Sequence, residues 1–491
     1  MADIEFVDQT LRDGPQSYWA MRMRAGVVTA VGDEFAHAGF RTIDLAGGTP
    51  FSVLMRYLRE DPWEWVDWIR RCIPGVRLRA GRNVTAMGGF GISSPAMLEL
   101  FVSTIIKHGV TSFWVYDCLY NMELIERACR SARAAGAEEV TPAIMYGISP
   151  VHTDEYFAAR VRQMASWTGI TDAIYFEDAA GILTPERAST LLPAIVQAAG
   201  TVPVELHCHN NTGMAPLNYL EGIKHGVRII HTASRPLANG PSLPSTEMMI
   251  DNIEALGHEH NLDVRMLQPI AEHFERVARQ EGHPVGAPNE YDVRIYHHQL
   301  PGGMTGTFKA QLAQYGMEDR LPEVLEEIVR VRDELGHPIS ATPFSQLMGI
   351  QAVLNVTQED RYAVVPDELV MYVLGYYGTP PAPMDQQVVD RVLSAPRAAE
   401  LADWERPDES VEELRVRYGC EHEPDEELLR RYLAPLEDIA ATKQAGPIAR
   451  DYQFSETATI SDVLGQILSM KRLGYAKFSH PGFSVSMAAR R

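Results

Sequence analysis

The feature that most constrains the fold is a regular alternation of short apolar segments with longer stretches of helical periodicity through the first half of the chain. The short segments are rich in the β-branched and aromatic residues that strands favour. Between them, for example at 96–108 and 123–135, apolar residues recur every three to four positions, which is typical of amphipathic helices. Eight strands are predicted on this basis, at 4–8, 41–46, 76–80, 112–117, 140–146, 173–177, 204–209 and 228–232.

Eight strand-and-helix units within roughly 250 residues match the size of a (β/α)8 barrel. A doubly wound open sheet is the alternative that the same alternation permits. The placement of chemically active side chains favours the barrel, because a barrel gathers its functional groups at the carboxyl ends of its strands. Five such residues lie at or just after predicted strand ends, namely Asp13, Asp117, Glu177, His207 and His231. The predicted fold class is therefore α/β, a TIM barrel followed by a second, mainly helical domain.

The second half of the chain changes character near residue 262, where the alternation stops and helical patterns dominate. Helices are predicted at 267–281, 321–335, 343–355 and 384–393, with a further one at 460–473. We predict three parts: a catalytic barrel at 1–262, a helical domain at 263–445, and a tail at 446–491 that contacts a partner subunit or the barrel.

Composition excludes several classes of function. The formal net charge is −21, and the 44 basic side chains form no track long enough to follow a nucleic acid. No apolar run approaches the roughly 18 residues of a membrane span. The five cysteines are scattered without CxxC spacing, which fits reduced thiols better than a disulfide framework. We expect a cytoplasmic protein with no nucleic-acid partner and no membrane span.

A pair of histidines, His207 and His209, ends one predicted strand. Residues two apart in a strand point to the same side, so both imidazoles can face one point. Imidazole nitrogens together with carboxylates suit a divalent ion such as zinc, manganese or cobalt.

Several segments together resemble the carboxyltransferase component of biotin-dependent enzymes of the pyruvate carboxylase, oxaloacetate decarboxylase and transcarboxylase type. The matching segments, in family order, are Asp8-Gln-Thr-Leu-Arg-Asp-Gly-Pro-Gln-Ser17, Ser149-Pro-Val-His-Thr153, Glu177-Asp-Ala-Ala-Gly-Ile-Leu-Thr-Pro185, Leu206-His-Cys-His-Asn-Asn-Thr-Gly-Met214, Pro301-Gly-Gly-Met304 and Ala341-Thr-Pro-Phe-Ser-Gln346. The first of these is shared with aldol-type lyases and Claisen synthases on the same barrel. The last two point to the carboxyltransferases.

The resemblance implies a metal site and a reaction pocket. Asp13, His207 and His209 would be metal ligands, with Arg12 and Gln16 lining the pocket. Arg12 would lie next to the oxygen of an enolate, where a metal and an adjacent guanidinium stabilise developing negative charge. Biotin would be supplied in trans on a carrier protein, with a biotin carboxylase as a further partner and a homodimer as the expected assembly.

Glu177 stands where the family usually carries a lysine that is modified to a metal-binding carbamate. A glutamate brings a carboxylate without modification, on a shorter side chain. We predict that Glu177 is a direct metal ligand; the alternative is that it only pairs with Arg12 or Arg82.

Two further departures concern the acceptor. Ala80 stands where the family has the arginine that grips a keto acid, and Pro241 replaces the threonine thought to relay a proton. Alanine cannot hold a carboxylate by a bidentate contact, and proline has no hydroxyl. Pyruvate and oxaloacetate are therefore disfavoured, unless Arg82 or Arg235 holds the carboxylate from another wall. Ser242 is predicted to move the proton instead.

The sequence offers no biotinyl domain, because Met470-Lys471 lies in a predicted helix without the β-rich surroundings of such a module. The leading interpretation is a carboxyltransferase subunit that moves CO2 between carboxybiotin and a small carbonyl-containing carbon acid, in carboxylation or decarboxylation. Two alternatives stay open at this point: a metal-dependent aldol or Claisen-type lyase without biotin, and a non-catalytic scaffold subunit.

Overall fold

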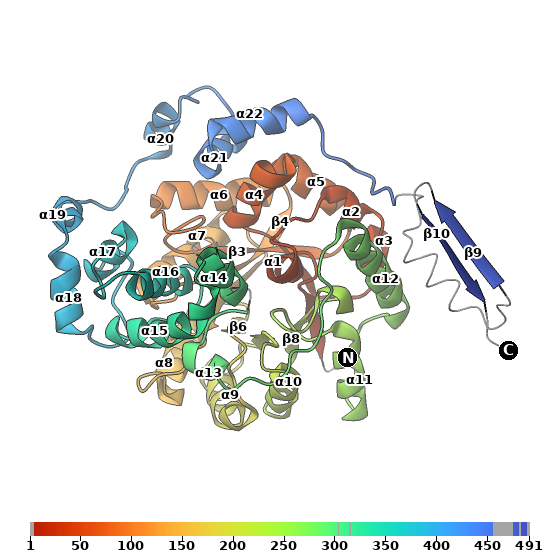
Figure 1. Cartoon of the computed structure of the whole chain (residues 1–491), viewed down its shortest axis with the longest axis horizontal. Helices are drawn as coiled ribbons and strands as arrows, with labels where there is room; N and C mark the ends of the chain where they lie inside the picture. Colours follow the sequence, from red (N-terminus) through yellow and green to blue (C-terminus); the bar gives the residue numbers. More distant parts are fainter. Residues whose placement is uncertain (1–3, 303, 314–315, 455–474, 481–482, 489–491) are drawn as a thin grey trace. The chain divides into compact units, whose positions relative to one another are not determined.

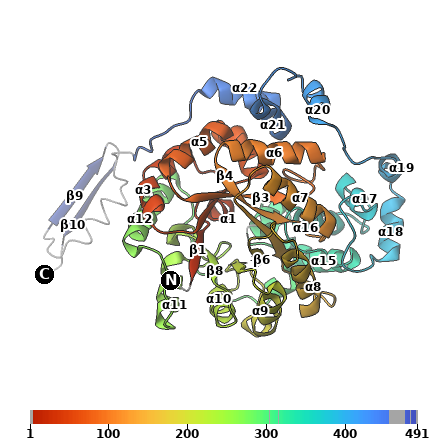
Figure 2. The ribbon, with the colours of Figure 1, turned by 180° about the vertical axis from the view of Figure 1, so that it is seen from behind.

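The computed structural model describes residues 4–302, 304–313, 316–454, 475–480 and 483–488. Eight parallel strands close a barrel in sequence order, with β1 hydrogen-bonded to β8, as Figures 1 and 2 show from opposite sides. The strands are β1 (Glu5–Asp8), β2 (Thr42–Ala46), β3 (Arg77–Asn83), β4 (Val110–Tyr116), β5 (Glu139–Met145), β6 (Ile174–Asp178), β7 (Val204–Cys208) and β8 (Ile229–Thr232). The predicted barrel is confirmed. The open sheet is wrong, because an open sheet would leave its edge strands unpaired.

Helices surround the barrel, except that the short α1 lies over its carboxyl end (Figure 1). They are α1 (Asp13–Tyr18), α2 (Ala25–Thr29), α3 (Gly32–His37), α4 (Gly48–Val53), α5 (Pro62–Cys72), α6 (Pro95–Lys107), α7 (Met122–Ala134), α8 (Asp154–Ala165), α9 (Pro185–Ala199), α10 (Ala215–Lys224) and α11 (Thr246–Ala255). Many of them begin at a polar cap: the side chains of Ser94, Thr153 and Thr184 each accept a backbone N–H of the first helical turn. Proline at the first position of α6 and α9 lacks the N–H that the helix could not use there.

The later part of the chain is mainly helical, as predicted. Its helices are α12 (Val264–Glu281), α13 (Ile295–His298), α14 (Met304–Ala313), α15 (Leu321–Glu334), α16 (Phe344–Thr357), α17 (Asp367–Val373), α18 (Gln386–Leu393), α19 (Pro396–Ala402), α20 (Val411–Arg417), α21 (Asp425–Leu433) and α22 (Leu436–Ala445). Figure 1 shows α21 and α22 running along the outside of the barrel beside α4 and α6. None of the helices in the described ranges is both long and apolar enough to cross a bilayer.

Two compact units make up the chain, residues 1–451 and 452–491. In the second unit, β9 (Tyr475–His480) and β10 (Phe483–Ala488) form an antiparallel pair. The predicted helix at 460–473 and Lys471 lie outside the described residues. The division into 1–262, 263–445 and 446–491 stays a prediction.

The interior of the barrel is polar and aromatic at mid-height. Arg79 is fully buried, and its guanidinium pairs with Glu139 and Glu205 at 2.6–2.8 Å, which compensates the cost of burying its charge. Two residues further along β3, a Cβ at Gly81 would lie 2.7 Å from the indole of Trp114, so this strand needs glycine there. Side chains therefore fill the barrel up to this level, and its carboxyl end is left for the site.

Candidate active site

Three predicted ligands meet at the carboxyl end of the barrel. Asp13 opens α1 just after β1, while His207 and His209 come from the end of β7. One ligand atom from each of the three lies within 4.8 Å of the others, and all three residues are buried. The period of two along β7 thus brings both imidazoles to one point, as predicted.

His209 is oriented by a backbone carbonyl. Its Nδ1 lies 2.5 Å from the carbonyl oxygen of Pro241, which can only accept, so Nδ1 carries the proton. Its Nε2 then presents a lone pair and lies 3.5 Å from Oδ1 of Asp13. Proline at position 241 therefore contributes its carbonyl to the site.

The remaining atoms of the cluster fit a divalent cation. Nε2 of His207 is buried without a hydrogen-bond partner in the described part of the chain, and burial lowers the pKa of His207 well below its ordinary value. A neutral imidazole with an unpartnered nitrogen beside a second imidazole and a carboxylate is a donor set that zinc, manganese and cobalt accept.

Arg12 lies beside this cluster and is held by two carboxylates. Its Nε donates to Asp44 at 3.2 Å and its Nη1 to Asp13 at 3.3 Å. Burial disfavours its charge, but Asp44 and Asp13 outweigh burial and hold the pKa of Arg12 above its ordinary value. Its Nη2 is buried without a partner in the described residues, which leaves the two N–H groups of this nitrogen for a bound molecule.

Glu177 enters from β6 but lies outside the three-residue cluster. Burial raises the pKa of its carboxyl to about 8, an effect that the nearby Arg12 opposes. Its Oε2 has no hydrogen-bond partner among the described residues. The sequence-based assignment of Glu177 as a direct ligand stays a prediction.

A cavity of about 320 Å³ lies over these groups. Barrel residues that line it include Arg12, Gln16, Trp114, Tyr116, Glu177 and His209. Residues from the helical part of the chain line it as well, namely Pro301, Ala341, Thr342, Pro343 and Gln346. The two motifs that pointed to the carboxyltransferases therefore border the same cavity as the barrel motifs.

The structure shows where the residues considered for acceptor binding and proton transfer lie. Ala80 is buried on β3, and Nη1 of Arg82 donates 2.7 Å to the carbonyl of Ala128 in α7, behind the barrel wall. Arg235 is exposed and does not line the cavity. Ser242 is fully buried and donates to Asp13 at 3.4 Å, so it contacts the predicted metal ligand rather than the cavity.

Comparison with known proteins identifies the family. The family described as "Conserved carboxylase domain" matches residues 295–446, and "HMGL-like" matches residues 148–273. A pyruvate carboxylase subunit of Methanocaldococcus jannaschii is 34% identical over 426 residues, which cover 84% of this chain and 74% of that protein. The chain belongs to the carboxyltransferase family of biotin-dependent carboxylases. The 2-oxoglutarate carboxylase large subunit of Hydrogenobacter thermophilus is 32% identical over 458 residues, covering 91% of this carboxyltransferase and 69% of that relative.

Solved structures agree with the fold of this carboxyltransferase. The carboxyl transferase domain from Rhizobium etli pyruvate carboxylase superposes with a TM-score of 0.81 at 24% identity, covering 91% of this chain and 78% of that one. The predicted resemblance is confirmed. The lyase and the scaffold alternatives are not favoured, because the relatives are carboxylase subunits and the helical segment matches a carboxylase family.

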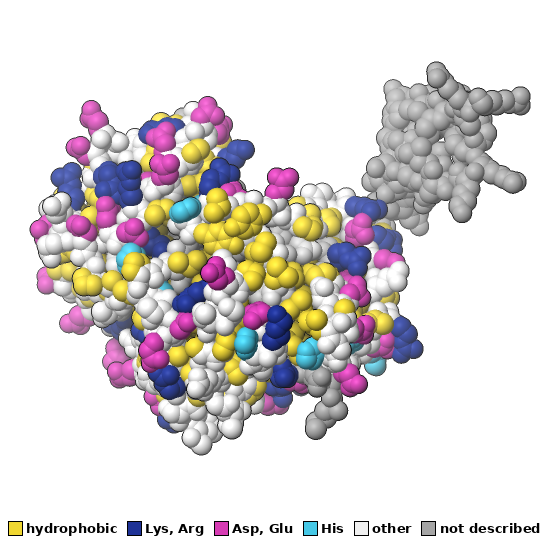
Figure 3. All heavy atoms as spheres, turned by 90° about the horizontal axis from the view of Figure 1, so that it is seen from below, with side chains coloured by type: hydrophobic (Ala, Val, Ile, Leu, Met, Phe, Trp, Pro, Cys, Tyr) yellow, Lys and Arg dark blue, Asp and Glu magenta, His cyan; other side chains and the backbone are white. Residues whose placement is uncertain are grey.

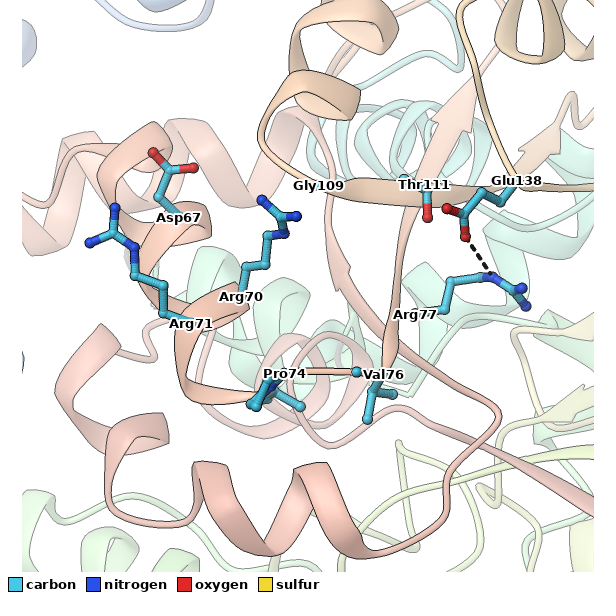
Figure 4. A pocket seen from close by; sticks show the side chains of 11 residues that line it. Asp67, Arg70, Arg71, Pro74, Val76, Arg77, Gly109, Thr111 and Glu138 are labelled. Atoms are coloured by element: carbon cyan, nitrogen blue, oxygen red, sulfur yellow. Dashed lines mark ion pairs between the residues drawn. The ribbon is translucent and has the colours of Figure 1, made fainter.

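A second cavity, of about 580 Å³, lies at the opposite end of the barrel (Figure 4). It is bordered by the end of α5 and the starts of β3 and β4, and Arg70 points between them while Arg77 turns to Glu138 at 3.5 Å. Barrel enzymes place their active sites at the carboxyl ends of the strands, so the cavity over His209 is the candidate site of this carboxyltransferase.

Sequence reasoning missed the residues that support the site from below. Asp44 holds Arg12, and the hydroxyl of Tyr175 lies 2.8 Å from Nδ1 of His207. Trp114 stacks on Tyr175 with ring centroids 4.9 Å apart and lies 5.4 Å below the guanidinium of Arg12. A polar residue inside an apolar strand, as Asp44 and Glu205 are, is the signal that could have found part of this layer.

Proposed function

We propose that this carboxyltransferase moves a carboxyl group between carboxybiotin, carried by a separate protein, and a small carbonyl-containing carbon acid. The observation that carries the proposal is the shared cavity. Its floor holds Arg12, Glu177 and His209, and its roof includes Pro301, Thr342 and Pro343 from the carboxylase-specific part of the chain. A barrel lyase without biotin would have no use for that roof.

Asp13, His207 and His209 would hold a divalent ion, zinc, manganese or cobalt, because their ligand atoms converge and Nε2 of His207 has no other partner in the described residues. We propose Glu177 as the fourth ligand, since its Oε2, which has no hydrogen-bond partner among the described residues, belongs to a side chain that lines the same cavity. When bound, such an ion polarises a carbonyl oxygen as a Lewis acid.

The chain's own residues bind and orient the acceptor. Arg12 is fixed by Asp13 and Asp44, so its Nη2, which has no partner in the described part of the chain, can donate to the acceptor's carbonyl oxygen without first losing side-chain freedom. Gln16, at the rim of the cavity, can donate from its amide to the same molecule. Ser242 donates to Asp13 and does not line the cavity, so we propose that it orients this ligand, while proton transfer by its hydroxyl stays a prediction from the sequence.

The acceptor is proposed to lack a carboxylate next to its carbonyl group. Among the described residues that line the cavity, the basic side chains are Arg12 and Arg82. Arg82 donates to Ala128 behind the barrel wall, and two carboxylates already hold Arg12. No guanidinium fork is therefore left for bidentate binding of a keto acid, which disfavours pyruvate and oxaloacetate.

The partners are suggested by the relatives, which are named as subunits of carboxylases, one of them as a large subunit. We propose that a biotin carrier protein and a biotin carboxylase work with this chain, which forms a homodimer.

The test is transfer of labelled CO2. A biotinylated carrier protein is charged with [14C]bicarbonate by a biotin carboxylase and ATP, then mixed with metal-loaded protein and a panel of ketones, thioesters and keto acids. After borohydride reduction, which keeps a β-keto acid product from losing its CO2 in acid, we expect acid-stable label in the product of one neutral carbonyl acceptor, lost in Asp13→Ala. His225→Ala, which changes an exposed histidine directly after α10 that pairs with Glu221, serves as the matched control. Release of label at the rate seen with Asp13→Ala, with no acceptor labelled, would contradict the proposal.

A further inference from the structure

A chain of four buried side chains runs beneath the candidate metal site. It leads from Arg79 on β3 to Glu205 on β7, on to His231 on β8, and ends at His207 on β7. All four residues are fully buried. The links measure 2.6 Å from Arg79 Nη1 to Glu205 Oε2, 3.1 Å from Glu205 to His231 Nε2, and 3.2 Å between the Nδ1 atoms of the two histidines.

The direction of each hydrogen bond along this chain can be deduced. Arg79 can only donate, and it donates to both oxygens of Glu205, which keeps that carboxylate as an acceptor. His231 Nε2 therefore carries a proton and donates it to Glu205.

Gln9 independently fixes the other nitrogen of His231. The amide nitrogen of Gln9 donates to the carboxylate of Asp44 at 3.2 Å, which sets the orientation of the amide. The same nitrogen lies 3.0 Å from Nδ1 of His231, so it directs its second N–H there. Nδ1 of His231 must then be an acceptor, in agreement with the proton on Nε2.

His207 faces that acceptor. Its Nδ1 lies 3.2 Å from Nδ1 of His231, whose one lone pair Gln9 also approaches, and 2.8 Å from the hydroxyl oxygen of Tyr175, which can accept. Two unprotonated nitrogens facing each other at 3.2 Å would repel, so we infer that Nδ1 of His207 carries the proton and donates it mainly to Tyr175. Its Nε2 is left with a lone pair, buried and without another partner in the described residues, beside Asp13 and His209.

We propose that Glu205, anchored by Arg79 and acting through His231, sets the tautomer of His207 that binds the metal. Glu205 and His231 are thus positioning residues for this site, while the carbonyl of Pro241 does the same for His209. Groups that hold the second nitrogen of a metal-binding histidine typically change metal affinity about 10–100-fold when they are removed. The inference rests on the proposed metal site for its purpose, but the tautomer itself belongs to the metal-free protein.

The first experiment reads that tautomer directly. Two-bond 1H–15N correlation spectra of metal-free, [15N]histidine-labelled protein distinguish an Nδ1–H imidazole from an Nε2–H imidazole, and the His207→Asn variant assigns the signal. We expect His207 as the Nδ1–H form. Finding the Nε2–H form in the wild-type protein would overturn the proposal without any need for a folded variant at Glu205.

The second experiment measures metal affinity by titration with Mn²⁺ and Zn²⁺. His231→Leu removes the nitrogen that faces Nδ1 of His207, and we expect the affinity for both metal ions to fall about 10–100-fold. His231→Asn can place an amide oxygen near the former Nδ1, so it should recover a large part of the affinity. Equal affinity in the wild type and His231→Leu would refute the role of His231.

Controls separate positioning from general loss of packing. Tyr372→Phe removes a buried hydroxyl that donates to the carbonyl of Leu335 in the helical part, so it should leave metal affinity unchanged. Thermal unfolding of every variant shows which are folded.

If the wild type shows the expected tautomer but binds no metal, the proposed metal site fails and the tautomer assignment stands. If the wild type binds metal but shows the other tautomer, the metal site stands and the positioning role fails.

Discussion

Glu177 brings a buried carboxyl to the cavity at the position where the family resemblance implies a modified lysine. Its pKa of about 8, raised by burial, shows how strongly this place disfavours an unpartnered negative charge. A divalent cation would remove that penalty. Metal binding would therefore explain a buried carboxyl group at this position, although the three-residue cluster of Asp13, His207 and His209 does not include Glu177.

Substitution of Glu177 tests this role. Glu177→Gln keeps the shape of the side chain but removes its charge, so we expect metal affinity to fall at least about 10-fold. Asp13→Ala should abolish binding, because it removes a member of the three-residue cluster. Equilibrium dialysis with metal analysis measures both. Unchanged affinity in Glu177→Gln would show that three protein ligands suffice.

The buried carboxyl of Asp8 predicts how the unfolding free energy depends on pH. Burial raises its pKa from 3.8 to about 7, against the hydrogen bonds from Thr10. The folded state therefore keeps a proton on Asp8 that the unfolded chain releases near its ordinary pKa. Between these two values the unfolding free energy falls as pH rises, by at most about 1.4 kcal/mol per pH unit from this group.

Asp8→Asn removes the titration while keeping an acceptor for the backbone N–H of Thr10. We expect the stability of the wild type relative to this variant to decline from pH 4 towards pH 7, the interval between the two pKa values, and to level off above it. Urea unfolding at a series of pH values measures the difference. A constant difference across that interval would contradict the assignment.

At the scale of elements, the strands were predictable because each combines β-branched residues with turn signals at both ends. Seven of the eight predicted ranges agree with the structure to within about two residues, the uncertainty usual for element ends. The exception is β3, predicted at 76–80, which continues to Asn83. Its end, Gly81-Arg82-Asn83, has low strand propensity and is held by pairing with β4.

The supporting layer of the site was harder to predict for a physical reason. Strands of a parallel barrel are buried on both faces, so the period of two does not show which residues point to the barrel axis. Tyr175 and Phe176 are both fully buried, yet the hydroxyl of Tyr175 bonds His207. His207, His209 and Asp13 could be predicted because they lie at strand ends, where polar residues have few other reasons to occur.

Gly81 provides the test at this scale. Gly81→Ala would place a methyl group 2.7 Å from the indole of Trp114, so the Trp114–Tyr175 stack must shift or β3 must move. Overpacking of this kind costs about 1–3 kcal/mol. We expect such a loss in urea unfolding, with a change in near-UV circular dichroism from the displaced tryptophan.

Gly91→Ala is the matched control, because a Cβ there meets nothing within 4 Å. It should alter the unfolding free energy by less than about 0.5 kcal/mol. Equal stability of Gly81→Ala and Gly91→Ala would mean that the Trp114–Tyr175 stack accommodates the added methyl group without strain.

At the scale of the whole molecule, the surface bears on assembly. The net charge of −21 favours solubility. Figure 3 nevertheless shows a face on which apolar side chains gather between scattered charged groups. Contiguous apolar surface of this kind commonly marks a contact with another protein. The proposed homodimer and the proposed carrier both need such a surface.

The proposed assembly has two contacts, one between the two chains of the homodimer and one with the carrier protein, and they should differ in stability. A homodimer formed through apolar surface should persist at high ionic strength, because salt screens charges but does not weaken apolar burial. In multi-angle light scattering we therefore expect twice the 54.7 kDa of one chain, at both low and high salt. The contact with the carrier must form and dissociate in every cycle, so it should be weaker and detectable only as a transient complex. A mass of one chain at micromolar concentration would contradict the dimer, and carboxyl transfer by that monomer would show that the active site is complete within a single chain.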